Sequence, residues 1–465
     1  MDLTVYEALK YRVRGIINKL PNSNSKTIEK KSKQTINGDL KIKLPIAYKE
    51  NIVSELSEQN GAKYSICVFD LDNTLIETDL FEVEREESQR KELDIIKFEN
   101  KLKNSYYRIF FDEEYLISLR SLYPNIKFVI FTRSTELYAN TLISHIYKKF
   151  NWDLIVTREN VRKTKPHNEG LELIMKKFHE IDPRKVLVIG DSDVDIKSAY
   201  YNNSTSLLTD WFVNTRKTEH WKAINLLPDG VINSSNMLSG ILKSGVELLS
   251  LESKLNKSEI KSYRFGSVSH FFPMDFNSEY ARKPFNIFVG GRYFSSEFLY
   301  KKESHLLTRS ILANKESHQF PIEWIESLTD FIESKLDNEK YSETIITVIP
   351  HRPNREPRLE FMLEQLSNFV KNKIEFRDVI FCKDLLGFYE GVLSQHNDRL
   401  NQHQRFENIG KHLYINKPDL VRNRNVIVID DVVTTGASLM YASIYLKNSG
   451  ANNVSLFALA QTISK

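Results

Sequence analysis

The stretch 65-SICVFDLDNTLIE-77 holds an apolar run that ends in two carboxylates, Asp70 and Asp72. Apolar and β-branched residues bounded by polar ones predict a buried β-strand. Residues two apart on a strand point to the same face, so both acids would share one side if the strand continues. By themselves, acids at a strand end also fit a turn followed by a helix cap. The role of these acids therefore depends on which residues the neighbouring strands place at the same edge of the sheet.

Three later stretches place polar groups directly after or beside apolar runs. KFVIFTRS ends its run at Thr132, and KTKPHNEG puts Lys165 before a proline and a helix, with Lys163 as the alternative cation. KVLVIGDSDVD runs into Asp191, and Asp195 follows four residues later. The carboxyl ends of parallel strands meet at one edge of a sheet, where ligands bind. We expect a hydroxyl, an ammonium group and several carboxylates there, which suits a phosphoryl group and Mg²⁺.

Four elements in this order resemble the four motifs of the haloacid dehalogenase superfamily, over about residues 62–245. The resemblance implies an α/β domain with a Rossmannoid parallel sheet and a Mg²⁺-dependent phosphatase acting on a phosphomonoester. Asp70 would be the nucleophile that forms an aspartyl-phosphate, and Asp72 the general acid and base. Thr132 and Lys165 would bind the phosphoryl group. The resemblance assigns the metal to Asp70, Asp72, Asp191 and Asp195.

The segment at about 78–112, between the first two strands, is rich in charge and aromatic residues. In the superfamily such an insert forms a small helical cap over the substrate pocket. Tyr106, Tyr107, Phe110 and Phe111 would either stack on a base or pack the cap, and the sequence leaves both interpretations open.

A second apolar run, 426-VIVIDDVVTTGAS-438, ends in the adjacent acids Asp430 and Asp431. The small residues that follow lead into an apolar helix pattern, so backbone N–H groups at a helix N-terminus would face an anion. Paired carboxylates beside such an anion site can accept hydrogen bonds from sugar hydroxyls. The pattern predicts a ribose-phosphate site made of Asp430, Asp431, Thr434, Thr435, Gly436, Ala437 and Ser438.

This stretch resembles the phosphoribosyl pyrophosphate (PRPP) motif of type I phosphoribosyltransferases, and residues 285–465 resemble their ComF-like branch. The resemblance implies a second parallel-sheet domain and Mg²⁺-dependent transfer from PRPP to a base or amine. Pyrophosphate would bind at His351 and Arg352, with Arg355 and Arg358 as alternates, because a guanidinium contacts two phosphate oxygens at once. Where the family usually has Arg-Gly-Phe, this chain has Arg-Leu-Glu-Phe, which departs from the pattern.

The polar segment 393–408 follows the pyrophosphate loop in the chain and carries Arg399 and Arg405. A mobile loop usually covers the site in this family, so we interpret the segment as a lid. An ordinary exposed loop is the alternative interpretation.

The whole chain is therefore expected to hold an N-terminal helical extension (1–61), a phosphatase domain (62–245), a linker or embellishment (246–284) and a phosphoribosyltransferase domain (285–465). The leading hypothesis is a bifunctional enzyme of nucleotide or nucleoside metabolism. The alternative is a PRPP- or nucleotide-sensing module that regulates the phosphatase without transferring anything, which requires coupling between the two sites.

The composition of the chain argues against several classes of protein. The 465 residues contain 41% hydrophobic residues, a net charge of +4 and two cysteines. A near-neutral balance argues against nucleic-acid binding, and two cysteines argue against a disulfide framework. No apolar run reaches the length of a membrane span, and the N-terminus lacks the apolar core of a signal peptide, so the cytoplasm is the expected compartment. A homodimer is compatible with the sequence, which specifies no oligomeric state.

Overall fold

The computed structural model describes residues 62–212, 217–258, 262–271, 284–336, 343–393 and 400–464. The expected N-terminal extension, 1–61, lies outside the described residues. The described residues fall within one compact unit, Gln59–Lys465, which contains two large sheets. No helix in these described ranges is long and apolar enough to cross a lipid bilayer.

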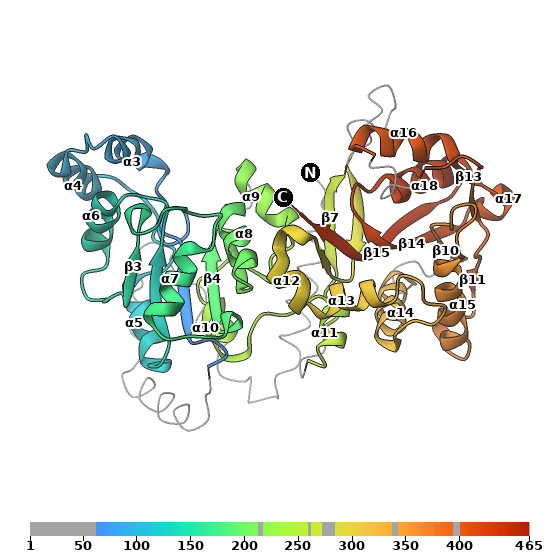
Figure 1. The fold of residues 1–465 in the computed structure, drawn as a ribbon, viewed down its shortest axis with the longest axis horizontal. Coiled ribbons are helices and arrows are strands. Elements are labelled where there is room, and N and C mark those ends of the chain that lie inside the picture. Colours follow the sequence, from blue (N-terminus) through green and yellow to red (C-terminus); the bar gives the residue numbers. More distant parts are fainter. Residues whose placement is uncertain are drawn as a thin grey trace, which may run out of the picture. The chain divides into compact units, whose positions relative to one another are not determined.

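The first sheet is a parallel sheet of six strands in the part of the chain described (Figure 1). Its strands are β1 (Ile66–Phe69), β2 (Lys127–Phe131), β3 (Leu154–Val156), β4 (Val186–Gly190), β5 (Thr205–Thr209) and β6 (Gly230–Ile232). Their order across the sheet is β3-β2-β1-β4-β5-β6. The apolar runs at 65–69, 127–131, 154–156 and 186–189 predict β1 to β4 within one residue of their observed bounds, and the structure confirms these strands. The pattern misses β5 and β6.

Helices follow the strands of this sheet, as a parallel connection requires. They are α3 (Glu82–Gln89), α4 (Ile95–Asn104), α5 (Glu113–Leu122), α6 (Glu136–Ile146), α7 (Glu169–Lys177), α8 (Asp193–Tyr201), α9 (Thr218–Asn225) and α10 (Met237–Ser244), with short 3-10 turns η1 (Asp79–Phe81), η2 (Arg158–Asn160) and η3 (Pro183–Lys185). The segment expected to form a cap, about 78–112, contains η1, α3 and α4. Phe81 and Phe98 stack edge to face there, with ring centroids 5.7 Å apart, so the small helices have their own aromatic core.

Both faces of the first sheet are buried, which explains why its strands have continuous apolar runs. Alternate residues of β1 enter different cores: Cys67 and Phe69 pack in one cluster, and Ile66 and Val68 in another. The first cluster includes residues of α5, α6 and α10, and the second includes residues of α7. Cys67 is fully buried, so it is a core residue.

The second sheet contains seven strands in the described ranges. Its strands are β7 (Gly266–Phe271), β8 (Phe285–Val289), β9 (Arg292–Phe294), β10 (Thr344–Val348), β11 (Val379–Phe381), β14 (Asn425–Val433) and β15 (Asn453–Ile463); β12 (Leu386–Phe388) and β13 (Leu413–Ile415) form a separate antiparallel pair. The associated helices are α11 (Ser250–Leu255), α12 (Leu299–Ser304), α13 (Leu306–Ala313), α14 (Ile322–Leu336), α15 (Arg358–Val370), α16 (Gln402–His412), α17 (Pro418–Val421) and α18 (Ala437–Asn448), with 3-10 turns η4 (Ser296–Phe298) and η5 (Ile374–Phe376).

One expectation about this second sheet needs correction. The order is β11-β10-β14-β15-β8-β7, with β9 also paired to β15, and β7 runs antiparallel to β8. The sheet is therefore mixed, where the sequence predicted a parallel one. The segment 246–284, expected to be a linker or embellishment, supplies α11 and the edge strand β7. The polar, aromatic-rich sequence of this segment does not predict β7, because this strand is stabilised by its pairing with β8. That pairing is a tertiary contact.

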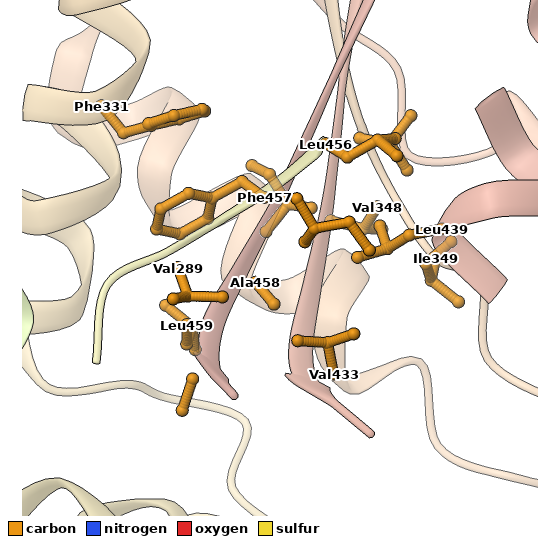
Figure 2. Close-up of a cluster of buried hydrophobic side chains, with 14 of the residues drawn as sticks. Val289, Phe331, Val348, Ile349, Val433, Leu439, Leu456, Phe457, Ala458 and Leu459 are labelled. Carbon is orange, nitrogen blue, oxygen red and sulfur yellow. The ribbon is translucent and has the colours of Figure 1, made fainter. Parts of the chain in front are cut away.

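The centre of the second sheet is a dry aromatic and aliphatic core around β15 (Figure 2). Phe457 is fully buried, and its ring centroid lies 4.4 Å from that of Phe331 on α14. Its neighbour Leu456 and Leu439 of α18 are buried as well. Residues 454–459 of β15, VSLFAL, are apolar except for Ser455, as expected for a strand that is buried on both faces.

A buried cluster of charges joins the two sheets, which we call the Arg292 cluster (Asp229, Glu252 and Arg292). Arg292 opens β9, and its Nη2 lies 2.8 Å from Asp229 Oδ1 and 2.6 Å from Glu252 Oε2. Asp229 directly precedes β6 of the first sheet, and Glu252 lies in α11. Burial raises the pKa of Asp229, but Arg292, Lys301 and the backbone N–H of Ser206 together outweigh burial, and the pKa falls to about 2. The pKa of Glu252 is also lowered, because Arg292 and His305 together outweigh its burial.

We expect Arg292→Leu to destabilise the protein by about 3–5 kcal/mol at pH 7, because it leaves two buried carboxylates without their cation. Both carboxyl pKa values are depressed in the folded state. The stability that the pairs contribute is therefore present above the unfolded pKa of about 4 and is lost as pH falls from there toward about 2. Urea unfolding at pH 7 and across the acid range measures both effects. Arg309→Leu, an exposed arginine of α13, is the control and should cost less than about 0.5 kcal/mol. Equal losses in the two variants would contradict the prediction.

Candidate active sites

The first site lies at the carboxyl ends of β1 and β4, which pair in parallel. Asp70 directly follows β1, and Asp191 directly follows β4. Asp195 lies in the first turn of α8 and is 1% exposed. One carboxylate oxygen from each of these three residues lies within 4.8 Å of the others. The structure thus brings together three of the four acids that the resemblance assigns to a metal.

Lys165 is the cation of this site. Its Nζ donates to Asp70 Oδ1 and to Asp195 Oδ1, both at 2.7 Å. The side chain is buried, whereas Lys163 is exposed. The structure therefore selects Lys165 over Lys163, which the sequence left as the alternative.

This site buries more negative than positive charge, and this imbalance causes the pKa shifts of its residues. Burial raises the pKa of Asp70 to about 7, although Lys165 opposes the rise. Burial also raises the pKa of Asp191, and the Asp70 carboxylate adds to it. Burial lowers the pKa of Lys165, but its two carboxylate partners outweigh burial and the net shift is upward. A protonated lysine among three acids leaves room for a further cation, and the hard oxygen donors suit a magnesium-like ion.

Asp72 lies outside the three-acid group, and its carboxylate is held by other residues. Its Oδ2 accepts from Ser134 Oγ at 2.6 Å, and its Oδ1 accepts from the Tyr138 hydroxyl at 3.1 Å. Arg85 of α3 lies 3.6 Å from the same Oδ1. The carboxylate is thus held by hydrogen bonds two residues from Asp70, a position that suits a general acid and base.

Thr132 follows β2 and is 1% exposed, with its Oγ1 accepting from the backbone N–H of Ser134 at 3.0 Å. It lies at the same edge of the sheet as Asp70, because β1 and β2 are neighbours. Three residues around Asp72 are not among those predicted from the sequence: Ser134, Tyr138 and Arg85. Ser134 could have been found from the sequence, because it stands two residues after Thr132. The other two residues belong to helices, and no sequence pattern identifies them.

We expect Mg²⁺ to raise the thermal unfolding midpoint of the wild type, because binding to the folded state stabilises it. Asp191→Asn should lose most of this rise, since it removes one of three charged oxygen ligands. Asp193→Asn is the matched control: Asp193 lies two residues further along the chain and pairs with Lys197 at 2.6 Å instead. Differential scanning fluorimetry with and without Mg²⁺ measures the shift. An equal Mg²⁺ response in Asp191→Asn would contradict the assignment.

The second site lies at the carboxyl end of β14. Asp430 and Asp431 line a cavity of about 420 Å³ together with Arg352, Arg358 and Ser438, and we call it the phosphate cleft. Burial raises the pKa of Asp430 to about 7, against the lowering by the two arginines. The cleft therefore places two acids opposite arginines, a charge pattern that suits a ligand with both hydroxyl and phosphate groups.

Arg358 forms an ion pair with Asp431, and its Nη1 donates to the Asn314 carbonyl oxygen at 3.1 Å. One of the two acids expected to hold sugar hydroxyls is therefore paired with one of the arginines expected to reach pyrophosphate. His351 and Arg355 also line the cleft, so the pyrophosphate loop and the acid pair do share one cavity.

Only part of the loop of small residues, 434–438, lies at this cleft. Ser438 lines it, whereas the Thr434 hydroxyl is exposed and lies 2.9 Å from the Thr462 hydroxyl. Gly436 has φ +76° and caps α18, a left-handed conformation that favours glycine. A Cβ there would also lie 3.0 Å from the ring of Phe271, so β7 packs closely over the turn.

The expected lid, 393–408, is partly helical. Residues 394–399, including Arg399, lie outside the described residues. Arg405 lies in α16, where its Nε donates to the Leu400 carbonyl oxygen at 2.9 Å. A capping box at Asn401 and Gln404 starts this helix, a local signal that the polar composition of the segment obscured.

Residues 81–208 match the family model of the haloacid dehalogenase-like hydrolases. The match includes Thr132, Lys165, Asp191 and Asp195, and it begins after Asp70. The chain therefore contains a haloacid dehalogenase-like hydrolase domain, and the roles of its individual residues depend on the geometry above. No curated protein is significantly similar to the chain.

Several solved structures are similar to part of the chain. One is a predicted phosphoglycolate phosphatase from Haemophilus somnus, with 13% identity and a TM-score of 0.31 over 38% of this chain and 98% of that one. A haloacid dehalogenase-superfamily hydrolase of subfamily IA from Geobacter sulfurreducens has 17% identity and a TM-score of 0.27, over 40% and 99%. A β-phosphoglucomutase from Clostridium difficile has 18% identity and a TM-score of 0.27, over 38% and 93%. At these TM-scores the likenesses add nothing to the family match.

Proposed function

We propose that the chain is a bifunctional enzyme. The hydrolase domain would cleave a phosphomonoester through an aspartyl-phosphate, and the C-terminal domain would transfer a phosphoribosyl group from PRPP to a base or amine. The observation that carries the first half is the contact of Lys165 with both Asp70 and Asp195. The acid pair opposite arginines in the phosphate cleft supports the second half.

In the hydrolase step, an Asp70 oxygen attacks phosphorus, the bond to the leaving alcohol oxygen breaks, and Asp72 gives that oxygen its proton. Asp72 then takes a proton from the water that attacks the phosphorus, and the bond to Asp70 breaks. Ser134 and Tyr138 fix the Asp72 carboxylate for both transfers. Lys165 and Thr132 would hold phosphoryl oxygens. A bound Mg²⁺, held by Asp70, Asp191 and Asp195, would neutralise phosphoryl charge.

In the transfer step, a nitrogen nucleophile would attack C1 of PRPP as the bond to pyrophosphate breaks. Asp430 and Asp431 would accept hydrogen bonds from the ribose hydroxyls. Arg352, with Arg358 once it leaves Asp431, would bind pyrophosphate oxygens. The protein would contribute mainly by positioning the two reactants and by compensating the charge of the pyrophosphate.

A PRPP-sensing domain is the second candidate, and the ion pair between Arg358 and Asp431 favours it. A site whose acid is already paired with an arginine can switch between a paired and a ligand-bound state. The Arg292 cluster offers a rigid link from this sheet to the hydrolase domain. PRPP that binds without being consumed, and that alters the phosphatase rate, would favour the sensor.

Asp70→Asn should lower hydrolysis of p-nitrophenyl phosphate by at least about a thousandfold, because the nucleophile is lost. PRPP binding should be unchanged, since the two sites lie at the ends of different sheets. Initial rates and calorimetric titration with PRPP check the two halves of this expectation. Retained hydrolysis would exclude Asp70 as the nucleophile.

The double variant Asp430→Asn, Asp431→Asn should weaken PRPP binding by about tenfold or more, because it removes charged acceptors for the ribose hydroxyls. Phosphatase turnover should stay at the wild-type level. The deciding assay is pyrophosphate release from PRPP and Mg²⁺ across a panel of bases and amines. Release that depends on one base and is lost in the double variant establishes the transferase. Unchanged PRPP affinity in the double variant would contradict the assignment of these acids.

A further inference from the structure

One buried histidine lies directly beside the three-acid group of the hydrolase domain. His220 belongs to α9, and its Nδ1 lies 3.0 Å from the backbone carbonyl oxygen of Asp191. A carbonyl oxygen can only accept, so Nδ1 carries the hydrogen of this bond. His220 stands 29 residues after Asp191 and beyond the end of the family match, so none of the sequence motifs includes it.

Asp210 holds the other side of the imidazole ring. This residue directly follows β5, and its Oδ1 lies 2.9 Å from His220 Nε2. The contact has the length of an ion pair without the direction of a hydrogen bond. Both side chains are buried, so solvent screens their attraction little. The ring is therefore held between two oxygen atoms at the carboxyl ends of the neighbouring strands β4 and β5.

The His220 ring contacts the peptide group that joins Asp191 to Ser192. The carbonyl oxygen of this group accepts from His220, and its N–H donates to Asp195 Oδ2 at 3.2 Å. The C=O and the N–H of a planar trans peptide point in opposite directions, so the group is held from both sides. Asp195 also packs against Gly190, where a Cβ would lie 2.2 Å from the Asp195 Cγ. These contacts fix the short turn from β4 into α8.

The turn is important because it carries Asp191. Lys165 donates to the other two acids of the group, Asp70 and Asp195, and so fixes one oxygen of each. The direction of the Asp191 side chain depends instead on the orientation of its own backbone, to which His220 is bonded. Mg²⁺ requires its oxygen ligands in a nearly ideal octahedral arrangement, so a rotation of this backbone would displace one ligand.

We propose that His220 is a positioning residue for the divalent cation of the hydrolase domain: its Nδ1–H orients the Asp191 turn, and Asp210 orients its ring. This inference rests on the proposed hydrolase function. His220 acts through the backbone and is not itself a ligand, because one ring nitrogen contacts a carbonyl oxygen and the other faces Asp210. Residues that orient metal ligands in this way typically contribute about tenfold to a hundredfold in metal affinity.

Two neutral substitutions of His220 isolate the hydrogen bond to the turn. His220→Asn places an amide N–H close to the position of Nδ1, so this variant can still donate to the Asp191 carbonyl oxygen. His220→Gln places its amide close to the position of Nε2 and leaves that carbonyl oxygen without its donor. The two variants have the same charge and the same functional group, so the difference between them reports on the hydrogen bond.

Calorimetric titration of the full-length protein with Mg²⁺, after removal of metal with EDTA, measures the effect. The binding event that Asp191→Asn abolishes identifies the site. His220→Gln should weaken this binding by about tenfold or more, and His220→Asn by less than about threefold. At saturating Mg²⁺, His220→Gln should keep the wild-type KM for p-nitrophenyl phosphate, because the residue does not contact the substrate.

Asp210→Asn leaves His220 in place but removes the charge that faces Nε2. It should weaken Mg²⁺ binding by about twofold to tenfold. Glu219→Gln, at an exposed position of the same helix, is the control and should bind Mg²⁺ as the wild type does. The thermal midpoint of each variant in EDTA measures helix packing separately, and it should be the same in His220→Asn and His220→Gln.

The outcomes separate this inference from the proposed function. Wild-type Mg²⁺ affinity in His220→Gln would overturn the positioning role and leave the metal site intact. So would equal losses of affinity in His220→Asn and His220→Gln, since only the first retains the donor. If His220→Gln does not fold, wild-type affinity in Asp210→Asn overturns the positioning role. Absence of Mg²⁺ binding by the wild type, or binding that Asp191→Asn leaves unchanged, would overturn the metal site itself, and the role of His220 with it.

Discussion

Buried carboxylates that require a cation organise this protein. Lys165 lies between Asp70 and Asp195, Arg292 between Asp229 and Glu252. Each pair would be strongly unfavourable in a protein interior without its cation, because a desolvated charge costs several kcal/mol. The cations therefore fix which loops meet at the strand ends. In the hydrolase domain the result is a buried carboxylate beside an ammonium group, and between the sheets it is a buried group of ion pairs.

The same constraint distinguishes the two sites. In the hydrolase domain the acids outnumber the single lysine, so the site retains negative charge that suits a metal ion and its phosphoryl ligand. In the phosphate cleft, arginines face the acids, and one of them, Arg358, is already paired with Asp431. A site of the first kind is prepared for chemistry on a phosphate group. A site of the second kind must open an internal ion pair before a ligand can use both partners.

Much of the hydrolase site could be predicted from sequence, because its parts are placed by local rules. Asp70, Thr132 and Asp191 each directly follow an apolar strand, and parallel strands bring their carboxyl ends together. The environment of Asp72 could not be predicted, since Tyr138 and Arg85 come from helices whose facing depends on packing. In the structure the Asp72 carboxylate accepts hydrogen bonds from Ser134 and Tyr138.

The sequence by itself determined the strands that are buried on both faces, because a continuous apolar run has no other stable place in a folded chain. It also determined which acids stand at their ends. Only the tertiary structure decided that β7 joins the second sheet antiparallel and that Lys165 and not Lys163 is buried. These features depend on contacts between residues far apart in the chain. No local pattern encodes such contacts, because their energy comes from burial and pairing that exist only once the sheets have assembled.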